Sequence, residues 1–232
     1  MSIAMERYCN RPRSSVCLGH ESEVICAHNF MSRDEAVAAR RRLDQLTEMR
    51  GMGFERARKP MMEAGDQFNQ TQVLRIESRT ETGLRAQLWH GAQRANLAGG
   101  WRYGIDRLER NFEALQSVRY EAPSGWYAEH IDTRFTWRDT MRRQRNDTYS
   151  SRVIAVIVQL TDRDPRGDYT GGELQAVLQS GKVLDAPPCA GDAIFFPAAY
   201  LRHRVQHLRS GSRRNLVWWI KGNPHPDSGR RA

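Results

Sequence analysis

The sequence predicts a mainly β fold with flanking helices (an α+β chain), in which antiparallel strands form a sandwich or barrel. From residue 112 onward, short apolar or alternating runs are separated by turn residues such as Pro123, Ser124 and Gly125. Many short strands at such spacing are typical of antiparallel sandwiches and barrels. Helical periodicity appears only before residue 112, and no stretch approaches the roughly 18 apolar residues of a membrane span.

The N-terminal third opens with a polar lead in which only Ser22–Ala27 has the character of a strand. Ser32 and Glu35 then form a capping box, in which the serine caps free backbone amides and the glutamate reaches back. Apolar residues at spacings of three and four continue to Arg50, and Gly51 follows as a left-handed stop. These features predict an amphipathic helix whose apolar stripe lies against a sheet.

The remaining elements follow in order. Residues 52–70 resemble a loop, Val73–Ser78 a strand and Gly83–Ala98 a helix. The later strands are predicted at Leu115–Tyr120, Tyr127–Asp132, Val153–Leu160, Leu174–Leu178, Lys182–Leu184, Ala193–Phe196, Val205–Leu208 and Asn215–Ile220. We therefore divide the chain into N-terminal supporting elements (1–111), a strand-rich core (112–222) and a polar tail (223–232).

Composition limits the classes of function. A chain of 232 residues with 39% hydrophobic residues fits one globular domain. The net charge of +9 would suit nucleic acid, but 33 of the 36 basic residues are arginines scattered along the chain, so a solvated basic surface is the preferred interpretation. The N-terminus has no apolar signal region, and a cytoplasmic protein without a membrane partner is expected.

The four cysteines allow two interpretations. Three of them, Cys9, Cys17 and Cys26, lie near His20 and His28, and the fourth is Cys189. A zinc knuckle in the N-terminal cluster would need tighter and more regular ligand spacing than this. Free cytosolic thiols are therefore preferred.

The most informative residues are His130, Asp132 and His203, followed by Arg213. Residues i and i+2 of a strand share a face, so His130 and Asp132 point the same way. Two histidines and one carboxylate can hold Fe(II) on one face and leave open positions, as in non-haem iron oxygenases. The pattern predicts a metal site that oxidises a substrate.

Arg213 is predicted to lie near His203, on a neighbouring antiparallel strand reached through a turn at Ser210–Gly211. No acidic residue shares the face of Arg213 along its strand. A buried guanidinium needs a counter-anion, because an unpaired buried charge is costly. A dicarboxylate ligand would meet that need through two parallel hydrogen bonds.

Four motifs occur in order over residues 112–222: Tyr120-x4-Gly125-x-Tyr127-x2-His130-x-Asp132, Tyr169-x-Gly171-Gly172-Glu173-Leu174, Pro188-x2-Gly191-Asp192-x2-Phe195-Phe196-Pro197, and His203-x-Val205-x5-Gly211-x-Arg213. This segment resembles the prolyl-4-hydroxylase-type Fe(II)/2-oxoglutarate dioxygenases. The resemblance implies a double-stranded β-helix, the jelly-roll or cupin barrel, backed by helices.

The resemblance also implies roles for individual residues. His130, Asp132 and His203 would bind Fe(II), and Arg213 would bind the distal carboxylate of 2-oxoglutarate. Tyr120 stands where such enzymes place a phenol near the co-substrate, and Gln159 stands where many relatives carry a tyrosine. His207 replaces a usual proline and rivals His203 as a ligand, although the gap of ten residues to Arg213 favours His203. An intact Asp132 favours hydroxylation, because related halogenases carry a small residue there.

The expected activity is hydroxylation of an unactivated C–H bond with O2, releasing succinate and CO2; ascorbate stays open as a further cofactor. The substrate is expected to be an amino acid, a peptide or a protein residue. Arginines flanking the metal strand suggest that it is anionic, although an ordinary solvated loop would show the same pattern; these flanking residues are Trp126, Arg134, Trp137, Arg138 and Arg142–Arg145. The alternatives are a nucleic-acid-directed oxygenase and a non-catalytic jelly-roll binding module.

Overall fold

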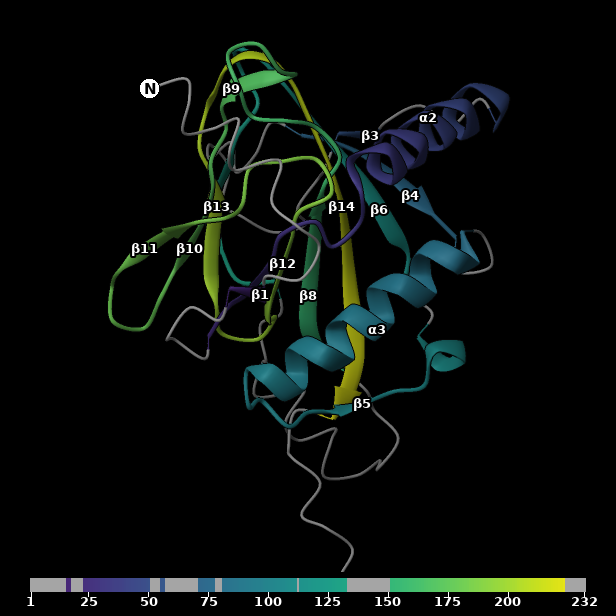
Figure 1. The fold of residues 1–232 in the computed structure, drawn as a ribbon, viewed down its shortest axis with the longest axis vertical. Coiled ribbons are helices and arrows are strands. Elements are labelled where there is room, and N and C mark those ends of the chain that lie inside the picture. The colour runs from purple at the N-terminus through teal and green to yellow at the C-terminus, as the bar shows by residue number, and fades with distance from the viewer. Residues whose placement is uncertain are drawn as a thin grey trace, which may run out of the picture.

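The computed structural model describes residues 16–17, 23–50, 55–56, 71–77, 81–111, 113–132 and 151–223. They form two antiparallel sheets, with helices α2 (Arg33–Arg50) and α3 (Thr82–Ala98) on the outside of the larger one (Figure 1). The prediction of a mainly β barrel with flanking helices is confirmed. No helix among these residues is long and apolar enough to span a membrane.

The larger sheet has ten strands and contains most of the strand residues. Its strand order is β1-β2-β12-β8-β14-β6-β4-β3, and β5 and β9 both pair with β14. The bounds are β1 Val16–Cys17, β2 Ile25–Ala27, β3 Glu55–Arg56, β4 Gln72–Ile76, β5 Gly104–Ile105, β6 Leu115–Glu121, β8 Ser151–Gln159, β9 Tyr169–Gly171, β12 Ala193–Pro197 and β14 Leu208–Asn223. Strands from the N-terminal part therefore widen the sheet that the later strands build.

The smaller sheet has four strands in the order β11-β10-β13-β7. They are β7 Tyr127–His130, β10 Leu174–Val177, β11 Val183–Asp185 and β13 Arg202–Val205. One apolar cluster fills the space between the two sheets, with Ile157 and Phe196 from the larger sheet and Ala176 and Val205 from the smaller one. This space is the barrel interior.

A second apolar cluster joins the helices to the outer face of the larger sheet. Ala39 and Leu43 of α2 and Leu88 of α3 pack with Leu216 and Trp218 of β14. A 3-10 turn, η1 (Leu108–Arg110), follows α3 and β5. Alternate residues of β14 thus serve two cores: even-numbered residues from 216 to 220 face the helices, and odd-numbered ones face the barrel.

The capping box at the start of α2 forms as the sequence predicts. The Ser32 amide donates to Glu35 Oε2 at 2.6 Å, and the Glu35 amide donates to Ser32 Oγ at 3.2 Å. Both hydrogen bonds satisfy backbone donors that the first helical turn leaves unpaired.

The hairpin predicted at Ser210–Gly211 is wrong. Both residues lie inside β14, which runs without a break from Leu208 to Asn223 and pairs with β9 over this stretch. The strand predicted at 205–208 is instead β13 at Arg202–Val205, and it belongs to the other sheet. Local polarity at Ser210–Gly211 suggested a turn, but the glycine is needed because two strands approach closely there.

Gly211→Ala is therefore expected to destabilise the protein by about 2 kcal/mol or more, from positive φ together with a backbone clash. Gly211 has φ +75°, and an added Cβ would lie 2.0 Å from the Asp168 carbonyl oxygen. Gly181→Ala is the matched control, because Gly181 has φ +84° but open space around it. Urea unfolding measures both variants, and equal losses would show that the clash is absent.

Cys189 is disulfide-bonded, so the expectation of free thiols is wrong for this residue. Cys9 and His20 of the proposed zinc knuckle lie outside the described residues. Among the residues that are described, the N-terminal histidine and cysteine positions contribute to no candidate metal cluster.

Candidate metal centre

His130, Asp132 and His203 converge at one end of the barrel interior. Strands β7 and β13 are antiparallel neighbours, and His130 and His203 are direct Cα partners. Asp132 lies two residues beyond the end of β7. Its Oδ1 lies 3.6 Å from His130 Nε2 and 3.7 Å from His203 Nε2. One ligand atom from each residue lies within 4.8 Å of the others, close enough for a single ion to contact all three.

Backbone carbonyls orient both imidazole rings. His130 Nδ1 lies 2.8 Å from the Ala128 carbonyl oxygen, and His203 Nδ1 lies 3.4 Å from that of Leu201. A carbonyl can only accept, so each ring donates from Nδ1 and keeps the lone pair of Nε2 for the space beside Asp132. Such partners fix the tautomer that a metal ligand requires.

The Asp132 carboxylate stays ionised although it is buried. Burial alone raises the pKa of Asp132, but the neighbouring imidazoles of His203 and His130 outweigh this effect and lower the pKa to about 2. A negative oxygen is therefore available at neutral pH, which a hard divalent cation requires of a carboxylate ligand.

The residues present fit an iron ion. Asp132 Oδ2 is buried and has no hydrogen-bond partner among the described groups, so this oxygen is available to a metal ion. Two imidazole nitrogens and one carboxylate oxygen on one side are the donor set of a facial iron site. That these three residues bind iron remains our prediction from sequence and geometry.

Arg213 lies in the same interior, on β14. Its side chain is completely buried, and Nη2 donates to Gln159 Oε1 at 3.2 Å. The guanidinium carbon lies 5.0 Å from the centre of the Tyr120 ring. Nε and Nη1 are buried without a hydrogen-bond partner in the described part of the chain. A buried cation with two unused donors suits an anionic ligand.

Tyr169 is a residue of this pocket that the sequence analysis did not single out. It is buried, and burial raises the pKa of its phenol while the positive charge of Arg213 opposes that rise. The same two effects act on Tyr120. Both phenols are therefore neutral beside Arg213. In the sequence, Tyr169 appeared only as the first residue of the Tyr169-x-Gly171-Gly172-Glu173-Leu174 motif, to which no site role was given.

His207 lies away from the metal ligands. It is exposed, and its ring stacks on Trp126 with centroids 5.3 Å apart. The cluster of candidate ligands contains His203 and not His207. The arginines and tryptophan predicted at 134, 137, 138 and 142–145 lie outside the described residues.

We expect His207→Ala to leave the affinity for Fe(II) unchanged within about twofold, because the exposed His207 ring stacks on Trp126 and does not belong to the cluster of candidate ligands. Anaerobic calorimetry with Fe(II) measures this, with His203→Ala as the comparison. A loss of affinity in His207→Ala as large as that in His203→Ala would show that the ligand assignment is wrong.

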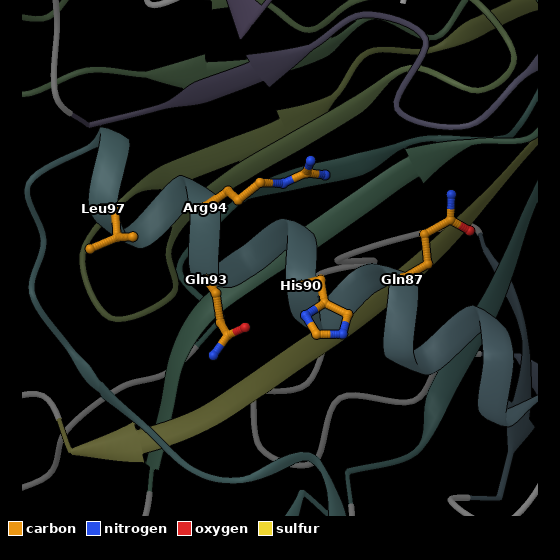
Figure 2. Close-up of a pocket in the computed structure, with 5 residues that line it drawn as sticks. All are labelled: Gln87, His90, Gln93, Arg94 and Leu97. Carbon is orange, nitrogen blue, oxygen red and sulfur yellow. The ribbon is translucent and has the colours of Figure 1, made fainter.

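A separate hollow lies on the outer face of α3. Gln87, His90, Gln93, Arg94 and Leu97 line it, all from that one helix (Figure 2). None of the predicted site residues contributes to it.

The part of the chain that resembles a known protein family is the barrel. The family model described as the 2OG-Fe(II) oxygenase superfamily matches residues 115–221. No curated protein sequence matches the chain. The matched segment begins at β6 and ends within β14, so it contains His130, Asp132, His203 and Arg213.

Solved structures share the fold at low sequence identity. A prolyl-4-hydroxylase from Pseudomonas putida has a TM-score of 0.60 at 17% identity, covering 87% of this chain and 93% of its own. A prolyl hydroxylase from Trichoplax adhaerens, in complex with a hypoxia inducible factor peptide fragment, has a TM-score of 0.60 at 14% identity, with 95% and 93% covered. A viral collagen prolyl hydroxylase from Paramecium Bursaria Chlorella virus-1, as a 2OG complex, has a TM-score of 0.56 at 16% identity, with 86% and 96% covered.

Proposed function

We propose that the protein hydroxylates an unactivated C–H bond of an amino acid, a peptide or a protein residue, a proposal supported by the match of residues 115–221 to the 2OG-Fe(II) oxygenase superfamily. One observation carries the proposal: the triad of His130, Asp132 and His203, whose side chains are at most 9% exposed, shares one interior with the completely buried Arg213. A metal site and an anion site in the same barrel suit a diacid co-substrate that binds at both.

Fe(II) and 2-oxoglutarate supply the oxidising chemistry when bound: O2 is consumed, the co-substrate becomes succinate and CO2, and a C–H bond becomes C–OH. The protein holds the reactants. His130, Asp132 and His203 would hold the metal. Arg213 would hold the distal carboxylate and so orient the co-substrate.

Apolar side chains keep water from the triad. The Phe196 ring contacts His203 with centroids 4.7 Å apart, and the Tyr127 ring contacts His130 at 4.1 Å. A dry surrounding strengthens the interaction of Asp132 with a cation.

An anionic substrate is supported by positive charges beside Trp219 of β14. The Arg152 guanidinium lies 3.9 Å over the ring of Trp219, which faces the barrel. Arg152 and Lys221 both pair with Glu113, so two positive charges share one carboxylate. The remaining positive charge favours a substrate that carries a carboxylate.

The test is succinate release from 2-oxoglutarate, measured with Fe(II) and O2 against a panel of free amino acids and proline-containing or acidic peptides. We expect release that depends on one class of the panel and that His130→Ala abolishes. Steeply salt-dependent binding to DNA or RNA, with release stimulated only by nucleic acid, would favour the rival substrate class. If no chelate absorption band forms anaerobically with Fe(II) and 2-oxoglutarate, the oxygenase proposal is wrong.

A cytoplasmic location stays a prediction.

A further inference from the structure

Asn215 occupies the barrel interior beside Arg213 and has no role in the function proposed so far. Val217 and Trp219 of the same strand pack in the cluster between the sheets, whereas Leu216 and Trp218 pack against the helices. Residues two apart on a strand share a face, so Arg213 and Asn215 both face the barrel interior.

The Asn215 side chain is buried without a hydrogen-bond partner for its carbonyl oxygen. Its exposed fraction is 2%, and no described group donates to Oδ1. A buried polar atom in this state costs free energy that a ligand or an ordered water can recover. A polar ligand or an ordered water beside Asn215 would therefore be stabilising.

Three polar residues are neighbours on the barrel face of the larger sheet. Asn215 is the direct Cα partner of Gln159 on β8. Arg213 lies two residues before Asn215 on β14, and its Nη2 donates to the Gln159 side chain, so the guanidinium extends toward that pair. Among the described residues, Nε and Nη1 of Arg213 and Oδ1 of Asn215 are buried without a hydrogen-bond partner.

We propose that Asn215 is a second binding residue for the distal carboxylate of 2-oxoglutarate, beside Arg213; this rests on the proposed function. Gln159 presents an acceptor that holds the guanidinium in place. A half-turn of the Asn215 amide exchanges its oxygen and nitrogen without a change of shape, and its N–H then donates to a carboxylate held by Arg213. The distal carboxylate of a 2-oxo diacid can accept hydrogen bonds from both Arg213 and Asn215. The methyl group of a 2-oxo monoacid of equal length can accept from neither, so the site selects the diacid.

The test compares two ligands on the Mn(II)-loaded protein by titration calorimetry: 2-oxoglutarate, and 2-oxopentanoate, which carries a methyl group in place of the distal carboxylate. In Asn215→Leu, a near-isostere, we expect the Kd for 2-oxoglutarate to rise about tenfold, the loss of one charge-assisted hydrogen bond. The Kd for 2-oxopentanoate should stay within about twofold. The same variant without ligand should melt about 2 °C higher, since it no longer buries an unpaired amide.

Ser117→Ala is the matched control. Ser117 Oγ is also buried with no hydrogen-bond partner among the described residues, but Ser117 is the Cα partner of Leu216, on the helix side of the sheet. Ser117→Ala removes this hydroxyl and should raise the melting temperature, as Asn215→Leu does. It should leave the Kd values for both ligands unchanged. A purely structural role for Asn215 would make the two variants behave alike.

The inference is overturned if Asn215→Leu binds 2-oxoglutarate as tightly as the wild type, or if it weakens both ligands equally. Should the leucine variant not fold, Asn215→Ala carries the same comparison. Failure of the proposed function looks different: the wild-type protein itself would not prefer 2-oxoglutarate to 2-oxopentanoate. If Arg213→Met removes the preference for 2-oxoglutarate while Asn215→Leu and Asn215→Ala both keep it, that result contradicts the role of Asn215 and leaves the proposed function standing.

Discussion

Asp132→Ala is expected to lower the affinity for Fe(II) at least about 100-fold and to abolish succinate release. Even the partners that orient metal ligands contribute 10- to 100-fold to affinity, and Asp132 is predicted to be a ligand itself. It also supplies the single negative charge of the triad, held ionised because the imidazoles of His203 and His130 lower its pKa to about 2 against the opposing effect of burial. Without it, the two histidines would face a divalent cation with no negative ligand beside them.

The measurement is anaerobic Fe(II) titration by calorimetry, with circular dichroism to verify the fold. Asp185→Ala is the control, because Asp185 is an exposed carboxylate on β11 of the same sheet. It should leave affinity and turnover unchanged. Wild-type affinity in a folded Asp132→Ala protein would remove this residue from the metal site.

Arg213→Met is expected to raise the Kd for 2-oxoglutarate at least about 100-fold, since hydrogen bonds to charged groups contribute about 1.5 to 3 kcal/mol each and the guanidinium can form two. The ligand-free variant is expected to be more stable than the wild type. Arg213 is completely buried, and two of its nitrogens have no partner in the described structure. Replacing an unpaired buried charge by an apolar chain of similar length removes that cost.

Arg214→Met provides the control for this change. Arg214 is the next residue of β14, faces the helices and pairs with Asp44 of α2. Its replacement should lower stability, because it leaves Asp44 without its partner, and should not alter binding of 2-oxoglutarate. Calorimetry and thermal unfolding measure both quantities. Weaker binding in Arg214→Met than in Arg213→Met would contradict the assignment of the anion site.

The elements with strong local signals agreed with the sequence. Helix α2 begins where Ser32 and Glu35 form their capping box, and it ends at Arg50. Helix α3 at Thr82–Ala98 and strand β6 at Leu115–Glu121 lie within one residue of their predicted bounds. These signals are local because capping and periodicity involve residues only a few positions apart.

Strand pairing was less predictable. Ser210 and Gly211 have the composition of a turn, yet they lie within β14, where Gly211 pairs with Tyr169 of β9 and lies close to the Asp168 backbone. β9 was not predicted, since three residues carry too little alternation to be recognised. Asp132 was expected on the strand itself, but β7 ends at His130 and the chain brings the carboxylate back to both histidines.

From residue types and their order, the sequence by itself determined that the chain forms an antiparallel β barrel and which residues are candidates for the metal and for the diacid. Only the tertiary structure decided that His203 and Arg213 come from different sheets and face one interior, that His207 stacks on Trp126, and that Gln159 and Asn215 lie beside Arg213. The reason is physical: alternation along a strand tells which side chains share a face, but the partner strand is set by contacts between distant residues, such as Arg213 and Gln159, which are 54 positions apart.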